Sequence, residues 1–456
     1  MKKIFISVLS IFMAVVLLSG CTKEKEPVAD INGIELDKFV IVYSDAVDYD
    51  LRAAEYIKEQ IKAITGIELE IKEDDSEKSA NEIVVGDTAR AISQQLTAPE
   101  KTTSFNMLFS DGSVAMEGEK FVIAAAAYYF VKTYVTAPVF SAEIASEVKE
   151  YEPIKETAKN FILLIGDGMG EYQSKLFEYM TIPSGKDYSD GESVFYGYML
   201  PYMGKAKTNS LSGLTDSAAS GTALSTGYKT TNGRIGRDKD GKDLKLLTEL
   251  ALEKKMGAAV MSTETQTGAT PSAFSAHANN RDEANAITIS QAMAVPRGLT
   301  ISCNFNKYDD AGIKLIEEKL MTVLNDKVQN ENGFFMMYEE AYIDKHCHSN
   351  DMETAFLAVV RFNQVIGRVM EFAFYNPATF VLVTADHETG GLEPDENNEL
   401  KYNSTNHTRA DVPVFAYGVG AEGFDGVTVN NVQIPKTIAK LMGESNFGDP
   451  DLEPAL

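Results

Sequence analysis

The chain has 456 residues, of which 44% are hydrophobic and 24% charged, a globular composition at a length for which about three domains is the loose expectation. Its formal net charge of −25 argues against nonspecific nucleic-acid binding, which needs a basic surface. With this charge, an anionic substrate would need positive charge concentrated at its binding site, for example from metal ions.

The first residues have the pattern of a secretory signal. Two lysines precede an apolar run over residues 4–18, which is too short for a comfortable membrane-spanning helix. The ending "LSGC" resembles the lipobox of bacterial lipoproteins, which implies removal of residues 1–20 and a lipid on Cys21. We therefore expect an exported protein, lipid-anchored to the cell membrane or outer membrane, with residues 21–32 as a charged tether. Plain secretion with an incidental cysteine is the alternative.

Residues 33–150 are predicted to form a separate small α/β domain. Strands are expected at "KFVIVYS", "IELEIKE" and "NEIVVGD", with a helix at "YDLRAAEYIKEQIKAITG". "FNMLFSDGSVAMEGE" predicts a hairpin that turns at Asp111 and Gly112, and "EKFVIAAAAYYFVKTYV" predicts a second helix. This order resembles the small domain ahead of the catalytic domain in hexosaminidase-type glycosidases. We interpret it as a structural or carbohydrate-binding accessory domain, followed by the linker "YEPIKETAK".

From Asn160 onward, short continuous apolar runs alternate with helical stretches. The runs "FILLI", "AAVMS", "FFMMY" and "FVLVTA" are apolar on both faces, which predicts a mostly parallel sheet covered by helices on both faces. We assign residues 158–456 to this catalytic α/β domain. Because ligands bind at the carboxyl ends of the strands in such sheets, the residues after each run are candidates for the site.

Side chains that can bind metal or carry out chemistry follow each of the four runs. After the second run comes the hydroxyl-rich loop "TETQTGATPSAFSAH". Among the acids and histidines after the other runs, the candidates are Asp167, Glu339, Asp344, His348, Asp386 and His387. Asp386 with Asp167 could hold one ion, with His387 as its nitrogen ligand. Four such loops at one rim predict a metal centre better than a set of solvated polar turns.

Asp344 and His348 are four residues apart, so a helix would place both on one face, where they could bind one ion. Two protein ligands are too few for zinc, and His407 can supply a third and leave an open position. His346 faces another side of that helix, so we expect it at the surface. His277 is expected to be structural or to support a ligand.

Ser217, in "LTDSAASGTALSTGYKTTNG", is the candidate nucleophile. A small-residue helix is predicted from Ser217 to about residue 225, and a helix N-terminus favours an oxyanion or phosphate. Thr215, Asp216 and Ser217 are also good N-cap residues, so a capping role is the alternative. The sequence has no GxSxG elbow, and its histidines are assigned elsewhere. We therefore interpret Ser217 as a serine activated by metal.

Residues from about 160 to 445 together resemble the alkaline phosphatase family. The motifs that carry the resemblance are, in order, "NFILLIGDGMG", "TDSAASGTALSTGYKTTNG", "ATPSAFSAHANNR", "FFMMYEEAYIDKHCH", "TADHETGG" and "HTRADVPVFA". The resemblance implies hydrolysis of small phosphate monoesters through a phosphoserine at Ser217. It also implies two Zn²⁺ ions, a third metal that is usually Mg²⁺, and permits a homodimer.

The resemblance implies a role for each matching residue. The first zinc site would consist of Asp344, His348 and His407. The second would consist of Asp386 and His387, with Asp167 bridging to the third metal. That metal would also be bound by Thr270 and Glu339. Arg281 would hold the phosphate, and Lys345 matches a lysine that lies near the phosphate in some members.

The sequence departs from the family in two places. The stretch between Arg281 and "FFMMY" is short and lacks the Gly-rich segment and crown-like insertion of longer members. Gly268 stands two residues before Thr270, where other members commonly carry Asp or His, and glycine offers no side chain to a metal. We therefore predict two tightly bound zinc ions and a third metal that is loose, exchangeable or absent, unless another residue, Glu264 or Thr267, has taken over the role. Gly268→Asp is expected to tighten that third site.

Two alternative functions stay open. One is a phosphodiesterase of the same superfamily; the C/S-x-P-x-R setting of a sulfatase is not matched by "TDSAASG". The other is a surface glycan-binding lipoprotein with an inactive phosphatase domain. Because every candidate ligand lies after Asn160, the sequence further predicts that residues 22–150 can be removed without loss of fold or activity.

Overall fold

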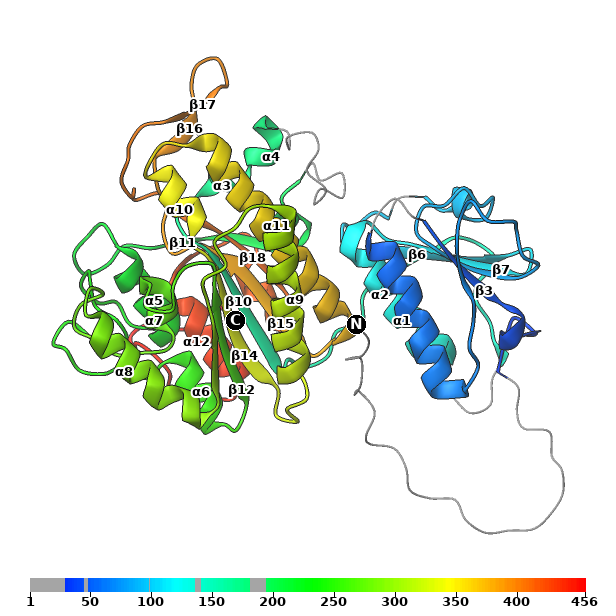
Figure 1. Cartoon of the computed structure of the whole chain (residues 1–456), viewed down its shortest axis with the longest axis horizontal. Coiled ribbons are helices and arrows are strands. Elements are labelled where there is room, and N and C mark those ends of the chain that lie inside the picture. The colour runs from blue at the N-terminus through cyan, green and yellow to red at the C-terminus, as the bar shows by residue number, and fades with distance from the viewer. Residues whose placement is uncertain (1–28, 45–47, 98, 136–140, 181–193) are drawn as a thin grey trace, which may run out of the picture.

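The computed structural model describes residues 29–44, 48–97, 99–135, 141–180 and 194–456. The predicted signal segment and Cys21 lie outside these ranges. Over the ranges that are described, none of the helices combines the length and apolar character needed to cross a bilayer. The chain is organised around two main sheets, a larger one after residue 159 and a smaller one before it (Figure 1).

The larger sheet has eight strands in the order β13-β12-β14-β10-β15-β18-β11-β19. In chain order its strands are β10 (Asn160–Gly166), β11 (Tyr202–Lys207), β12 (Gly257–Ser262), β13 (Leu299–Ser302), β14 (Phe334–Glu340), β15 (Thr379–Thr384), β18 (Val412–Tyr417) and β19 (Thr428–Asn430). Only β18 runs antiparallel to its neighbours. Every residue of β10, β14 and β15 is buried, as expected for runs that are apolar on both faces. The predicted mostly parallel sheet is confirmed.

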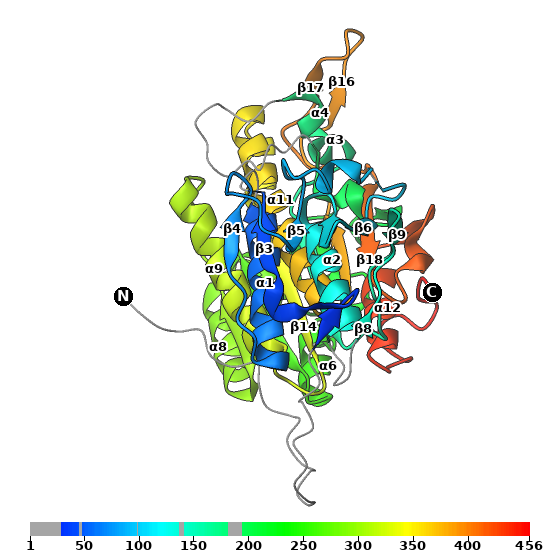
Figure 2. The ribbon, with the colours of Figure 1, turned by 90° about the vertical axis from the view of Figure 1, so that its right-hand side faces the viewer.

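Helices cover both faces of this sheet (Figures 1 and 2). The helices of this unit are α3 (Glu171–Ser174), α4 (Leu176–Tyr179), α5 (Ser217–Thr226), α6 (Leu247–Glu253), α7 (Ala269–Ala273), α8 (Ala284–Ala294), α9 (Asp310–Lys327), α10 (Tyr342–Cys347), α11 (Met352–Tyr375) and α12 (Gln433–Leu441), of which α3, α4 and α10 lie at one end of the sheet. The long helix α11 packs against α9 and α10, while α5 and α6 pack with α12. A short hairpin, β16 (Leu392–Pro394) and β17 (Leu400–Tyr402), projects from the end of the sheet that carries α10.

The smaller sheet has the order β4-β3-β5-β7-β6-β9. Its elements are β3 (Val40–Tyr43), α1 (Asp48–Thr65), β4 (Ile71–Glu73), β5 (Glu82–Val85), β6 (Phe105–Ser110), β7 (Ser113–Glu117), α2 (Ile123–Phe130) and β9 (Lys149–Tyr151). The predicted strands, both helices and the hairpin are present, with Ser110 paired to Ser113 across the turn. The predicted linker is shorter than expected, because its first residue, Tyr151, pairs with Phe105.

Helices α1 and α2 pack against α11 of the larger unit. Arg52 Nε lies 3.0 Å from Glu371 Oε1, and the rings of Tyr56 and Tyr375 stack with their centroids 4.1 Å apart. Phe121, which is fully buried, contacts residues on both sides of this boundary. The two units therefore share one continuous hydrophobic core.

Candidate active site

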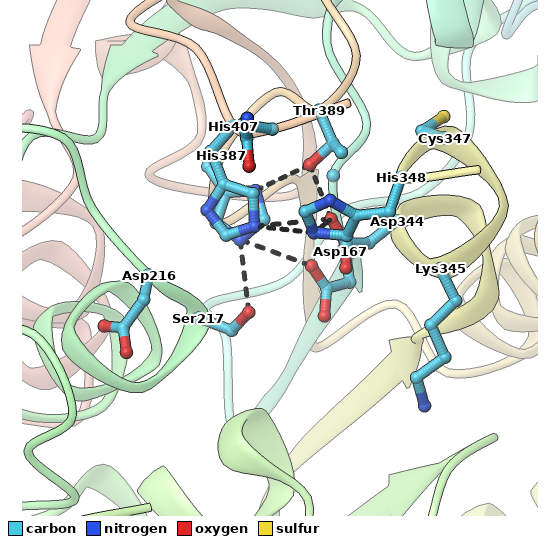
Figure 3. A network of polar contacts seen from close by, with 12 residues as sticks. Asp167, Asp216, Ser217, Asp344, Lys345, Cys347, His348, His387, Thr389 and His407 are labelled. Atoms are coloured by element: carbon cyan, nitrogen blue, oxygen red, sulfur yellow. Dashed lines mark hydrogen bonds and ion pairs between the residues drawn. The ribbon is translucent and has the colours of Figure 1, made fainter. Parts of the chain in front are cut away.

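The strand ends of the larger sheet bring the predicted acids and histidines together. Ile165 of β10 is level with Glu339 of β14 and with Thr384 of β15. The loop after β10 and the loop after β15 consequently begin at the same edge of the sheet. Helix α10 follows β14 there, and Figure 3 shows its Asp344 and His348 side chains converging with those of the two loops. This edge is the one that the sequence predicted for the site.

Asp344, His348 and His407 form one group whose ligand atoms all lie within 4.8 Å of one another. The Nε2 atoms of His348 and His407 are 3.1 Å apart, and each lies within 3.6 Å of Asp344 Oδ1. His348 Nδ1 lies 2.6 Å from the Thr405 carbonyl oxygen, and His407 Nδ1 lies 2.9 Å from that of Thr215. Since a carbonyl oxygen only accepts, both Nδ1 atoms must carry the proton. In the neutral rings, two Nε2 lone pairs and a carboxylate then face one another, an arrangement that fits a cation.

Asp167, Asp386 and His387 form a second, fully buried group. His387 Nε2 lies 3.2 Å from Asp386 Oδ2 and 3.5 Å from Asp167 Oδ1. Neither carboxylate oxygen has a hydrogen-bond partner among the described residues. The Thr389 hydroxyl donates to Asp344 Oδ1 and lies 3.2 Å from His387 Nδ1, so it accepts the Nδ1 proton and leaves the Nε2 lone pair free. This donor set also fits a metal ion.

The acid groups of the site are electrostatically crowded. Burial and the Asp386 carboxylate raise the pKa of Asp167 well above its usual value. Burial and the Asp344 carboxylate raise the pKa of Asp386 to about 7. Burial and the neighbouring His407 hold the pKa of His387 well below its usual value. Each shift has the direction expected for charges forced together in a dry site, and a bound cation would oppose the shifts of the carboxylates.

Ser217 opens α5 with its hydroxyl turned toward this metal-ligand cluster (Figure 3). Its Oγ lies 3.2 Å from His387 Nε2, and the residue is 4% exposed. Asp216, and not Ser217, caps the helix: Asp216 Oδ1 accepts from Ala219 N at 2.9 Å. Asp216 therefore has the capping role that the sequence left open for Ser217.

Arg281 and Lys345 lie on different sides of the cluster. Arg281 Nη1 lies 3.5 Å from Asp216 Oδ2, which brings a partly exposed guanidinium to the helix that carries Ser217. Lys345 Nζ donates instead to Glu264 Oε2 at 2.8 Å. Glu264, in the loop "TETQTGATPSAF", is one of the two residues that the sequence offered as a replacement for the side chain missing at Gly268.

Glu339 and Thr270 lie beside each other behind the second group. Both are fully buried, and Glu339 Oε1 and Thr270 Oγ1 find no hydrogen-bond partner within the described part of the chain. Ser262 donates to the other oxygen of Glu339. Burial and the Glu264 charge raise the pKa of Glu339 well above its usual value. Together with Asp167, these atoms could hold a third, oxygen-liganded metal.

The remaining two histidines lie apart from both ligand groups. His346 Nε2 lies 2.8 Å from the Tyr308 hydroxyl, on the other side of α10. His277 is held between the Gly236 carbonyl oxygen, at 2.8 Å, and Glu249 Oε1, at 3.1 Å. The structure thus separates these two from the candidate ligands. His346 is half-buried beside Tyr308, however, and not at the surface as the sequence analysis expected. Thr389 is the residue that sequence reasoning missed, although it stands inside the motif "TADHETGG".

The sequence is similar to those of known alkaline phosphatases. The family model for Alkaline phosphatase matches residues 158–304 and 298–401. Alkaline phosphatase 4 of Bacillus subtilis is 29% identical over 345 residues, which cover 63% of this chain and 73% of that protein. Alkaline phosphatase of Escherichia coli is 38% identical over 133 residues, which cover 27% of this chain and 26% of that protein.

Solved structures show the same likeness. Alkaline phosphatase from the Antarctic bacterium TAB5 matches with a TM-score of 0.53 and 24% identity, over 63% of this chain and 99% of that one. A mutant of the TAB5 enzyme with Mg bound in its M3 site matches with a TM-score of 0.53 and 26% identity, over 65% of this chain and 100% of that one. The shared fold therefore spans nearly all of the TAB5 enzyme and about two thirds of this chain.

Proposed function

Because the chain belongs to the alkaline phosphatase family, whose members hydrolyse phosphoesters, we propose that it is a zinc-dependent phosphomonoesterase working through a phosphoserine at Ser217. The observation that carries the proposal is the pair of ligand groups beside the Ser217 hydroxyl. In each group, lone pairs are directed at one point by hydrogen bonds on the far side of the histidine rings.

One zinc ion would be held by Asp344, His348 and His407, and a second by Asp386 and His387 with Asp167. A third metal, Mg²⁺, would use Asp167, Thr270 and Glu339, which offer the oxygen ligands that Mg²⁺ prefers. When bound, such ions stabilise charge on the oxygens of phosphoryl transfer and lower the pKa of a nearby hydroxyl. These positive charges would also attract a phosphate dianion to a protein whose net charge of −25 would otherwise repel it.

The chain's own residues would then perform an in-line displacement. The guanidinium of Arg281 would hold two unesterified phosphate oxygens through its planar fork. Ser217 Oγ would attack phosphorus as its proton passes to water, so that the Oγ–P bond forms, the ester O–P bond breaks and the alcohol leaves with a proton from water. Water would attack the phosphoserine in turn, releasing inorganic phosphate and restoring the hydroxyl. The N-terminal end of α5 favours the negative charge on the transferring group.

Hydrolysis of p-nitrophenyl phosphate and bis-p-nitrophenyl phosphate by the zinc-loaded protein tests the monoester proposal. We expect the monoester to be the better substrate, because the Arg281 fork suits two unesterified oxygens. A chelator should abolish the activity, and added Zn²⁺ should restore it. Faster hydrolysis of the diester would make the protein a phosphodiesterase instead. A protein that binds zinc and cleaves neither substrate would favour the glycan-binding alternative.

The export proposal rests on the sequence "MKKIFISVLSIFMAVVLLSGC". We propose that the mature chain begins at Cys21 and carries a lipid anchor outside the cytoplasm. Thr22 follows the cysteine where an aspartate would signal inner-membrane retention in Gram-negative cells. Cys21→Ser should move the protein from the membrane fraction to another fraction, whereas unchanged fractionation would argue against a lipid anchor.

A further inference from the structure

Gly268 has no side chain, yet the space where one would lie is filled. A Cβ atom at this position would stand 1.9 Å from Glu264 Oε1 and 2.1 Å from Glu264 Cδ. Both distances are far below any real contact, so the Glu264 carboxylate occupies the place of a side chain at position 268. Glu264 reaches that place from the loop that begins where β12 ends.

Glu264 is joined through Ser262 to one of the candidate third-metal ligands. Its backbone N–H donates to Ser262 Oγ at 3.0 Å, and that hydroxyl donates to Glu339 Oε2. The Glu264 side chain is only 16% exposed. Its other oxygen accepts from Lys345 Nζ at 2.8 Å, which places the ammonium group beside it.

Two buried oxygen atoms that lie beside each other also fit a cation. Glu339 Oε1 and Thr270 Oγ1 are fully buried and have no hydrogen-bond partner within the described ranges. Unpaired polar atoms of this kind are costly unless a ligand, a water or an ion satisfies them. Carboxylate and hydroxyl oxygens with room for waters are the ligands of Mg²⁺.

We propose that Glu264 supplies the carboxylate that Gly268 cannot, completing the third metal site of this chain and holding Lys345 beside it. The inference rests on the proposed metallophosphatase function. Of the two outcomes expected from the sequence, a weak third site or one rebuilt by another residue, it selects the second and assigns the role to Glu264. It also reverses the expectation for Gly268→Asp, because a new side chain there would collide with Glu264.

The test moves the carboxylate from position 264 to position 268 and measures the binding of Mg²⁺. The wild type, Glu264→Ala, Gly268→Asp and the double variant Glu264→Ala/Gly268→Asp are stripped of metal, reloaded with two equivalents of Zn²⁺ and titrated with Mg²⁺ by calorimetry.

Loss of one ligand should weaken Mg²⁺ binding about 10–100-fold in Glu264→Ala. Gly268→Asp alone should weaken binding as well. The double variant should recover most of the loss, because its new aspartate enters the vacated space. Glu396→Ala, an exposed glutamate in the β16–β17 turn, is the matched control and should bind as the wild type does.

Two results would overturn the inference: wild-type Mg²⁺ affinity in Glu264→Ala, or a double variant that binds no better than Glu264→Ala. If Gly268→Asp alone fails to fold, the comparison of Glu264→Ala with the double variant still decides the matter. Zinc content and p-nitrophenyl phosphate hydrolysis of the wild type are measured in the same preparations. An active wild type with two zinc ions and unchanged Mg²⁺ binding in Glu264→Ala would remove the inference and leave the proposed function intact.

Discussion

Hydrogen bonds on the outer side of the histidine rings determine which nitrogen faces each candidate metal. For His348 and His407 the partners are backbone carbonyl oxygens, at 2.6 Å and 2.9 Å from Nδ1. For His387 the partner is the Thr389 hydroxyl, whose own proton goes to Asp344. One buried hydroxyl therefore links the two ligand groups and orients a ligand in each.

Thr389→Val should weaken zinc binding without altering any ligand. Valine keeps the shape of threonine but removes the hydroxyl, so His387 and Asp344 each lose an orienting bond. Loss of such a supporting contact typically costs about 10–100-fold in metal affinity. Competition with a chromophoric chelator measures the change, and Thr322→Val on the exposed face of α9 is the control. Zinc affinity equal to the wild type would show that the Thr389 hydroxyl does not orient the ligands.

The metal-free protein should become less stable as the pH rises from about 4 to 8. Asp386 has a folded-state pKa of about 7, above the ordinary value for a free carboxyl, so the folded state binds more protons than the unfolded state across this interval. Stability is therefore present at low pH and is lost as Asp386 ionises. Asp386→Asn removes this contribution, so the metal-free variant should show a smaller fall in Tm over the same interval. An equal fall in Tm with pH in the two metal-free proteins would show that ionisation of Asp386 does not cause the loss of stability.

At the scale of single elements, α5 shows how a short helix presents the nucleophile. Asp216 Oδ1 caps the first turn, while its Oδ2 accepts from Gly233 N at 2.9 Å and lies 3.5 Å from Arg281. The N-terminus of α5, the following loop and the arginine are thus tied to one carboxylate. Gly227, with φ at 74°, ends the helix in the left-handed conformation that glycine tolerates.

Asp216→Ala should lower both stability and substrate binding. Loss of an N-cap costs about 1 kcal/mol of stability, and Arg281 loses the carboxylate that positions it. We expect a lower Tm and a raised KM for p-nitrophenyl phosphate, whereas Asp351→Ala, at the N-cap of α11, should lower the Tm alone. A raised KM in Asp351→Ala, or an unchanged KM in Asp216→Ala, would show that Asp216 does not act on substrate binding by positioning Arg281.

The elements that the sequence predicted well are those set by local pattern. The runs that became β10, β12, β14 and β15 are apolar on both faces, and the hairpin is marked by Asp111 and Gly112. Thr389 could not be assigned in this way, because its partner Asp344 lies far along the chain. Glu264 was only one of two candidates to replace Gly268, because residue spacing does not show that its carboxylate occupies the place of a side chain at position 268. The Glu264 carboxylate comes to lie at the side-chain position of Gly268 only when the loop that contains both residues is folded.

At the scale of the whole molecule, the smaller unit cannot be treated as an independent attachment. Phe121 packs against Tyr196 with ring centroids 5.2 Å apart and against Phe374 at 6.0 Å. The side chain of Glu371, only 6% exposed, is paired with Arg52 across the boundary. The sequence pattern showed two units and a linker, and the apolar face that joins them became visible only in the packing of α1 and α2 on α11.

Removal of residues 22–150 should therefore damage the catalytic unit, contrary to the expectation from sequence. Truncation uncovers the buried face of α11, the helix that follows the ligands of α10, and we expect low solubility or a much lower Tm. Phe121→Ala in the full chain is the milder test and should cost about 3–5 kcal/mol. Its unfolding should stay a single transition, because the core is shared. A soluble truncation with wild-type Tm and kcat would show that the interface is dispensable.

The most direct test of the central claim is to trap the phosphorylated enzyme. The zinc-loaded wild type is incubated with p-nitrophenyl phosphate, quenched in acid and digested, and its peptides are analysed by mass spectrometry. We predict a phosphoryl group on Ser217 in the wild type, and none in Ser217→Ala protein that has the same zinc content and nearly no activity. Phosphate trapped on another residue, or Ser217→Ala protein that keeps about half of the wild-type rate, would contradict the account.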